Sequence, residues 1–303
     1  MKTNCPSCGS AEHKLIFQAR DLRLRTSPEM FNIVKCSGCG LIYLNPRPDK
    51  EQVINFYPSN FNQETPALIH KIWSACVSPI ENSIISTIKK YKKSGKLLDI
   101  GCGSGRFLSL LQKQGFDVWG CELNLNSKDF APKSLEGRIF YNELSKCGFA
   151  PKSFDAVIMI QSLEHMSQLD ELLIEIRRVI KDSGIVFIYV PNMDYFEFRL
   201  FGPYSYNLEA PRHLYYFTRR SISDLLSRHG FKVDRFFRKH PLEIFSSPTS
   251  LHYGLWAYWE DKNILKNKTL KRLTFFPLVI IGFILRFFLF YEEQSLTVVC
   301  HKD

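Results

Sequence analysis

The sequence contains no charge-free apolar run long enough to span a membrane, and its first residues lack the apolar stretch that a secretory signal needs. It is also poor in acidic residues: 30 Asp and Glu stand against 40 Lys and Arg, a net charge of +10. The missing signal predicts a cytoplasmic protein, and the charge favours anionic partners such as nucleic acid, nucleotide-linked substrates or an acidic membrane surface. With 45% hydrophobic residues among 303, a disordered or fibrous chain is excluded.

A disulfide framework is not indicated either, because the chain has nine cysteines, an odd number. Four of them form two C-x-x-C pairs, each followed by glycine: Cys5 with Cys8, and Cys36 with Cys39. Two residues between cysteines let both thiolates of a turn face one ion, and two such turns complete a tetrahedral site. The spacing therefore predicts a closed, structural zinc site, with unligated buried cysteines as the alternative.

The stretch from Lys96 to Leu108 reads as a buried strand, a glycine turn and an amphipathic helix. Glycines let a ligand approach the backbone closely, and the helix start offers free amide donors. The spacing Gly101, Gly103, Gly105 is G-x-G-x-G, not the G-x-G-x-x-G of nicotinamide and flavin enzymes. A second strand ends at Glu122, 23 positions after Asp99, where a carboxylate suits the two hydroxyls of a ribose.

The pattern Asp-x-Gly-x-Gly-x-Gly followed by Glu122 resembles motif I and the acidic residue of the class I S-adenosylmethionine-dependent methyltransferases. The resemblance implies an α/β, Rossmann-like sheet of order 3-2-1-4-5-7-6 with strand 7 antiparallel. Its later strands would fall at 137–144, 154–160, 184–190, 231–237 and 295–301. It also implies cofactor contacts at Asp99, Gly101, Gly103, Gly105, Glu122, Leu123, Leu144 and Gln161.

A closer likeness rests on the cysteine pairs, the run from Gly40 to Pro48, motif I and the segment Pro211-Arg212-His213-Leu214. Together they resemble bacterial methyltransferases of the Methyltransf_23 type, which are often associated with surface polysaccharide or lipid-linked precursors. The resemblance supports the reaction class better than the acceptor. We expect a zinc-ribbon-like module at 1–48, a helical linker at 49–95, and a catalytic domain at 96–303 with an insertion at 240–294.

Methyl transfer is an in-line displacement, so a hydroxyl acceptor needs positioning and one base. His165 follows the fourth predicted strand, at the edge where open α/β sheets bind ligands, and His213 lies in an aromatic-rich loop after the fifth. Both are candidate catalytic bases, and the alternative is a side chain bonded to backbone near a helix start. Glu164 is a weaker candidate. Arg212 is expected either to bind an anionic group on the acceptor or to form a surface ion pair.

The insertion has a strongly apolar second half, from Leu273 to Tyr291. Its charge-free run, Leu273 to Leu285, has 13 residues, which is short for a membrane span of roughly 20. Two interpretations stay open: a helical hairpin packed on the sheet or in a dimer interface, and a helix lying in a membrane surface. The second places an aromatic boundary and a basic cluster against the head groups: Trp256, Tyr258 and Trp259, with Lys262, Lys266, Lys268, Lys271 and Arg272.

The leading functional prediction is O-methylation of a small-molecule, sugar or lipid-linked glycan acceptor. One rival is a nucleic-acid methyltransferase, since a zinc finger before such a domain also resembles certain ribosomal RNA guanine methyltransferases. The segment from Gln161 to His165 lacks the Asn/Asp-Pro-Pro-aromatic signature of many exocyclic-amine methyltransferases, which disfavours that rival. The other rival is a silent cofactor-binding scaffold, which the intact glycines and Glu122 disfavour. The oligomeric state is not predicted.

Overall fold

The computed structural model describes residues 4–57, 67–237, 243–265, 267–275, 277–281, 284 and 294–303. The chain divides into two compact units, each made of three segments. Unit 1 contains Met1–Pro58, Pro191–Arg219 and Arg238–Ser295, and unit 2 contains Ser59–Val190, Arg220–Phe237 and Leu296–Asp303. The domain boundaries expected at 48 and 95 stay predictions.

Unit 2 is built on a seven-stranded sheet of order β10-β11-β8-β7-β4-β5-β6. Its central pairs β4·β5, β4·β7, β5·β6 and β7·β8 are parallel, whereas β10 and β11 are antiparallel. Read in chain order this is the expected 3-2-1-4-5-7-6 arrangement, so the α/β, Rossmann-like prediction is confirmed. The strands are β4 (Gly95–Ile100), β5 (Phe116–Cys121), β6 (Ile139–Phe140), β7 (Phe154–Ile160), β8 (Ile180–Pro191), β10 (Phe231–Phe237) and β11 (Ser295–Lys302).

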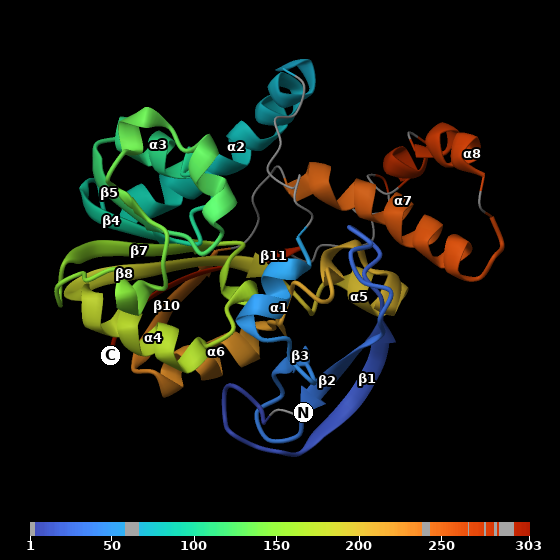
Figure 1. Ribbon diagram of the computed structural model, residues 1–303, viewed down its shortest axis with the longest axis horizontal. Coiled ribbons are helices and arrows are strands. Elements are labelled where there is room, and N and C mark those ends of the chain that lie inside the picture. The colour runs from blue at the N-terminus through green and yellow to red at the C-terminus, as the bar shows by residue number, and fades with distance from the viewer. Residues whose placement is uncertain are drawn as a thin grey trace. The chain divides into compact units, whose positions relative to one another are not determined.

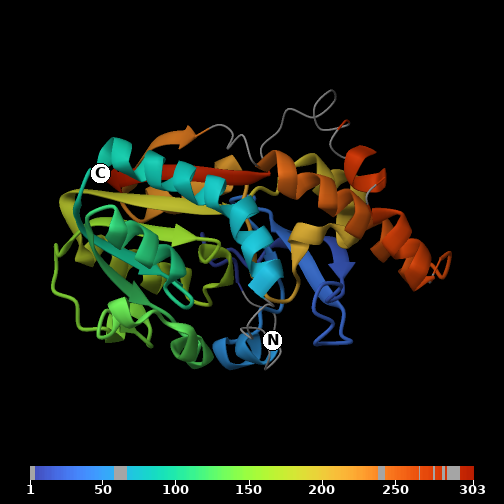
Figure 2. The same cartoon turned by 90° about the horizontal axis from the view of Figure 1, so that it is seen from above.

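Helices cover both faces of this sheet (Figure 1). They are α2 (Ala67–Tyr91) and α3 (Arg106–Lys113) on one face, and α4 (Leu169–Val179) and α6 (Arg219–Arg228) on the other. The view from above shows α2 lying along the sheet (Figure 2). Ile88 of α2 and Leu108 of α3 are fully buried against Leu97, Ala156 and Phe187 of the sheet. Parallel strands covered on both faces must be apolar throughout, which explains their continuous hydrophobic runs.

Unit 1 is built on a four-stranded sheet of order β1-β2-β3-β9, in which all three pairs are antiparallel. Its strands are β1 (His13–Ala19), β2 (Phe31–Cys36), β3 (Ile42–Leu44) and β9 (Tyr215–Tyr216). Its helices are α1 (Lys50–Asn55), α5 (Phe196–Phe201), α7 (Glu243–Asp261) and α8 (Lys268–Leu273). The N-terminal sheet is therefore completed by a strand from a distant part of the sequence.

The insertion forms the helices α7 and α8 of unit 1. At one residue it differs from the membrane arrangement, one of the two interpretations that the sequence left open. Trp256 is fully buried, and its indole N–H donates to the Thr274 hydroxyl at 3.0 Å. It therefore packs between α7 and the segment after α8 and cannot sit at a lipid boundary, because a buried indole satisfies its donor within the protein. Lys266 and positions 276, 282, 283 and 285–291 lie outside the described residues.

Among the described residues, no helix has both the length and the apolar character required to cross a membrane.

Candidate functional site

The glycine turn follows β4 in unit 2 and takes a backbone conformation that favours glycine. Gly101, Gly103 and Gly105 have φ values of 77°, 56° and 80°, in the left-handed region. A Cβ on Gly101 would come within 2.6 Å of Ser162 Cβ, and one on Gly105 within 2.6 Å of Ile139 Cδ1. A Cβ on Gly103 would meet nothing within 4 Å, so the middle of the turn is open to a ligand.

Glu122 is bound to this turn from the end of β5. Its Oε2 accepts from the Gly103 N–H at 2.8 Å, and its Oε1 accepts from the Leu123 and Asn124 N–H groups at 2.7 and 2.8 Å. Three backbone donors fix the carboxylate beside the open side of the turn. A carboxylate held there suits the two hydroxyls of a ribose, so these residues fit the expected cofactor.

Asp99 is the last residue but one of β4, just before the turn, and is 4% exposed. Burial raises the pKa of its carboxyl to about 8, and the nearby Glu122 carboxylate adds to the shift. A perturbed carboxyl at the carboxyl edge of a parallel sheet is a frequent mark of a binding site.

The other predicted positions of unit 2 follow the same edge of the sheet. Leu144 begins a short 3₁₀ helix and is buried, whereas Gln161 follows β7 with an exposed side chain and a φ of 50°. His165 ends the 3₁₀ helix Leu163–His165 and is partly buried. Burial raises the pKa of the neighbouring Glu164 to about 8.

Ser162 belongs to the turn although the sequence analysis did not select it. Its hydroxyl donates to the Ile100 carbonyl at 2.7 Å, and its Cβ fills the space that a side chain at Gly101 would need. It thus ties the end of β7 to the end of β4. A serine in the segment after the fourth strand was the only signal in the sequence, and serine is common in such turns.

The four cysteines of unit 1 lie together: Cys5 and Cys8 precede β1, Cys36 ends β2, and Cys39 lies in the turn between β2 and β3. The Cys5 and Cys39 sulfurs are 3.5 Å apart, as are those of Cys8 and Cys36, and all four lie within 4.8 Å of one another. Tetrahedral ligation at a Zn–S distance of about 2.3 Å needs sulfurs about 3.8 Å apart, so the cluster fits a zinc ion.

The surroundings of Cys36 favour its ligand form. Burial raises the pKa of its thiol, but the Cys39 N–H, the Cys8 thiol and the Gly38 N–H outweigh burial and lower the pKa to about 7. Metal binding requires a thiolate, so hydrogen bonds that lower a thiol pKa assist it.

His213 lies in unit 1, in the segment between α5 and β9. It is 3% exposed, and its Nδ1 is 3.1 Å from the Asn207 carbonyl oxygen. The alternative of a backbone-bonded histidine is therefore observed here. It does not exclude a role as a base, because the second ring nitrogen is a separate group.

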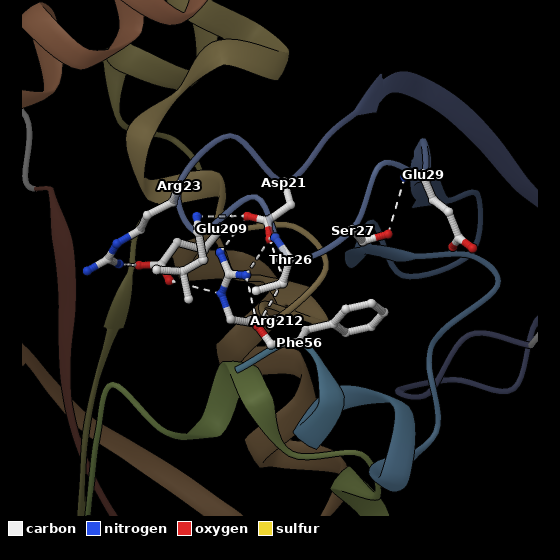
Figure 3. A network of polar contacts seen from close by, with 9 residues as sticks. Asp21, Arg23, Thr26, Ser27, Glu29, Phe56, Glu209 and Arg212 are labelled. Atoms are coloured by element: carbon white, nitrogen blue, oxygen red, sulfur yellow. Dashed lines mark hydrogen bonds and ion pairs between the residues drawn. The ribbon is translucent and has the colours of Figure 1, made fainter. Parts of the chain in front are cut away.

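The expectation for Arg212 is wrong in one respect, because its ion pair is not at the surface. Its side chain is completely buried and pairs with Asp21, which is equally buried (Figure 3). A guanidinium enclosed by its own chain is not available to an anionic acceptor group. Sequence reasoning missed Asp21, since only the fold brings residues so far apart into contact.

The family model described as a methyltransferase domain matches residues 80–235, just over half of the chain. The ubiquinone biosynthesis O-methyltransferase of Pelagibacter ubique is 30% identical over 118 residues, which are 36% of this chain and 49% of that protein. Methyltransferase GfsG of Streptomyces halstedii is 31% identical over 97 residues, 29% of this chain and 35% of that protein. The matched region thus spans half or less of either relative.

Among solved structures, a SAM-dependent methyltransferase from Archaeoglobus fulgidus matches with a TM-score of 0.48 and 19% identity, covering 74% of this chain and 94% of that one.

Proposed function

Because this chain belongs to the methyltransferase-domain family, we propose that it transfers a methyl group from S-adenosylmethionine to a hydroxyl of a small acceptor. The observation that carries the proposal is the Glu122 carboxylate, held by the Gly103 N–H beside the open side of the glycine turn. S-adenosylmethionine would supply the activated methyl group. The protein residues would position it: Glu122 at the ribose, Leu123 and Leu144 beside the adenine, and the turn and Gln161 beside the methionine part.

A binding measurement tests the cofactor assignment without any acceptor. We expect S-adenosylhomocysteine to bind the protein, and Glu122→Gln to weaken binding about tenfold or more, because a charged acceptor of hydrogen bonds becomes a neutral one. Glu171→Gln is the matched control, since that carboxylate is exposed on α4 and accepts from the Gln168 side chain. No binding by the unsubstituted protein at millimolar ligand would contradict the proposal.

The acceptor is proposed to be a small molecule, a sugar or a lipid-linked glycan. The names of the relatives support a small acceptor, since one relative is an O-methyltransferase of ubiquinone biosynthesis. Incubation with methyl-labelled cofactor and host lysate separates the possibilities. Label in nucleic acid would instead favour the rival nucleic-acid methyltransferase, and label in organic extract would favour a lipid-linked acceptor.

His165 and His213 are proposed as alternative bases for the acceptor hydroxyl. Single-turnover transfer by His165→Ala and His213→Ala, with S-adenosylhomocysteine affinity measured beside it, separates the two. The base is the residue whose loss slows transfer by about a hundredfold or more while binding is kept. A residue whose removal leaves the rate unchanged is not the base.

Cys5, Cys8, Cys36 and Cys39 are proposed to hold one structural zinc ion. The closed four-sulfur arrangement leaves no position for substrate, so the ion would stabilise the fold and take no part in transfer. Metal analysis of the purified protein should return one zinc per chain, and Cys36→Ser should lower that content.

A peripheral membrane contact through residues 273–291 is proposed on one observation. Leu273, Ile280 and Ile281 expose 68%, 59% and 46% of their surface beside the basic pair Lys271 and Arg272. Apolar side chains flanked by basic ones suit an anionic lipid surface. We expect cosedimentation with anionic vesicles at low salt and its loss in Leu273→Glu/Ile280→Glu. Protein that stays in the supernatant would contradict this contact.

A further inference from the structure

A buried ion pair joins the N-terminal segment of unit 1 to the segment that carries His213. Arg212 Nη1 and Nη2 donate to the two carboxylate oxygens of Asp21, each at 2.9 Å, and neither side chain is exposed. This bidentate geometry is the strongest that a guanidinium and a carboxylate can form. Asp21 follows β1, whereas Arg212 precedes β9.

Further hydrogen bonds surround the pair, as buried charges require. Asp21 also accepts from the Leu24 N–H at 3.1 Å and from the Thr26 N–H and hydroxyl at 2.8 and 2.7 Å. Arg212 donates further to the Phe56 carbonyl at 3.4 Å (Figure 3). Burial would raise the pKa of Asp21, but the hydrogen bonds from Arg212 and Thr26 outweigh it and hold that pKa well below its usual range. The pair is therefore ionised at neutral pH.

The turn that the pair holds is strained. Glu209 has a φ of 40°, in the left-handed region that residues with a side chain rarely adopt. Its carbonyl accepts from the Arg212 and His213 N–H groups at 2.8 and 3.1 Å, and its carboxylate pairs with Arg23. A strained turn persists where its surroundings impose it, and here Asp21 and Arg23 both reach it from the N-terminal segment.

The carbonyl of Asn207, two residues before this turn, determines which nitrogen of His213 holds the proton. A carbonyl oxygen only accepts, so the 3.1 Å contact with the Asn207 oxygen requires the proton on Nδ1. In the neutral ring the lone pair that can take a proton is then on Nε2. This is the form that a general base needs when its other nitrogen is held by the backbone.

We propose that Asp21 is a positioning residue for methyl transfer: through Arg212 it fixes the turn that presents His213 in its Nδ1–H form. The inference rests on the proposed function, in which His213 is a candidate base. It gives the N-terminal segment a part in the reaction through its contacts within unit 1.

The test is a double variant, Asp21→Leu/Arg212→Met, which removes both charges and keeps the volume. Replacing both partners of a buried pair by apolar residues generally preserves folding, whereas removing one leaves an unpaired buried charge. Long-range proton–nitrogen spectra of the histidine-labelled protein report the tautomer, and His213→Ala assigns the signal. Arg25→Gln is the control, because Arg25 lies in the same loop as Asp21 and its exposed side chain pairs with Glu260 of α7.

We expect a single Nδ1–H form of His213 in the unsubstituted protein and a mixture of both tautomers in the double variant. Single-turnover transfer to the methyl-accepting lysate fraction should fall about a hundredfold, the usual effect of a small misplacement of a reacting group. The control should change neither. A double variant that keeps the single tautomer, or loses it without slower transfer, overturns the proposal. Absence of S-adenosylhomocysteine binding by the unsubstituted protein is the separate result that contradicts the proposed function.

Discussion

Burial controls the protonation of two carboxyl groups near the glycine turn. Asp99 and Glu164 both lie at the carboxyl edge of the sheet in unit 2, and burial raises the pKa of each to about 8. In the unfolded chain both carboxyls are exposed to water and lose their protons near pH 4. The folded apoprotein therefore binds protons that the unfolded chain has already lost.

Asp99→Asn should flatten the pH dependence of stability. Between about pH 4 and pH 8 the folded state holds the Asp99 proton and the unfolded state does not, so the free energy of unfolding falls as pH rises through this window. Asparagine removes that loss, which is on the order of a few kcal/mol. Thermal unfolding of both proteins from pH 5 to pH 9, without cofactor, measures the difference. Asp182→Asn, at an exposed carboxylate, serves as the control. If the unfolding temperatures of Asp99→Asn and the unsubstituted protein changed equally with pH, the raised pKa of Asp99 would be contradicted.

Gly101→Ala should abolish or strongly weaken S-adenosylhomocysteine binding. The new methyl group would meet Ser162 Cβ at 2.6 Å and would also require an alanine at φ 77°. Gly115→Ala isolates the second effect, because its φ is 91° and its Cβ meets nothing within 4 Å. We expect both variants to lose about 1–2 kcal/mol of stability from backbone strain, and only the first to lose affinity by about tenfold or more. Equal S-adenosylhomocysteine affinities of the two variants, measured by calorimetry, would show that the turn accommodates the methyl group at position 101 without loss of binding.

At this scale the sequence predicted the residues whose spacing is local. Asp99, the three glycines and Glu122 follow a pattern set by one strand–turn–helix unit, and the structure brings Glu122 to Gly103. The cysteine pairs likewise meet as their spacing predicts. Asp21 and Ser162 were missed because their partners, Arg212 and the Ile100 carbonyl, are remote in sequence. No periodicity or spacing specifies such a contact.

Among the elements, strands were predicted more closely than their connections. β7 and β10 have the expected bounds, and the apolar run of β7 ends at the polar residues Gln161 and Ser162. β6 shrinks to Ile139–Phe140 at the sheet edge, where one neighbouring strand supplies the pairing. The helical insertion was predicted, but its internal packing was not, since an aromatic residue suits both a lipid boundary and a core.

Trp256→Ala should loosen the α7–α8 pair of helices. The indole is fully buried, donates to Thr274 and lies 5.8 Å from the Lys271 ammonium. Removing a buried tryptophan costs about 3–5 kcal/mol, whereas Trp256→Phe should cost less because the ring is partly retained. Denaturant unfolding measures both. Leu273→Ala, at a largely exposed side chain, should stay within about 0.5 kcal/mol. A small effect of Trp256→Ala would mean that the helices are held elsewhere.

For the whole molecule, the division into two units predicts separable responses to metal removal. The cysteine cluster lies in unit 1 and the glycine turn with Glu122 lies in unit 2. A structural zinc site contributes about 10 kcal/mol or more to folding, so a chelator should lower the unfolding temperature of unit 1. Binding of S-adenosylhomocysteine should persist.

Scanning calorimetry with and without chelator, beside a binding titration, measures both responses. Cys36→Ser should reproduce the effect of the chelator, and Cys300→Ala, in β11 of unit 2, should not. Loss of cofactor binding together with the first transition would show that the two units unfold as one.

The division itself could not be predicted from the sequence. The expected modules were continuous segments of the chain, because changes in composition along a sequence mark only the linkers between consecutive modules. Unit 1 instead gathers three separate segments. β9 is only two residues long, so its sequence pattern is too weak to predict that Tyr215 pairs with Tyr43.

This pairing has a consequence for biosynthesis. β3 is joined along one side to β2, but the strand that covers its other side, β9, is made about 170 residues later, and contacts so distant in sequence form slowly. While the ribosome translates the intervening sequence, the backbone groups on that side of β3 have no strand to pair with, and exposed strand edges promote aggregation. We therefore expect nascent chains to expose this edge of β3 until the segment containing Tyr215 has left the exit tunnel.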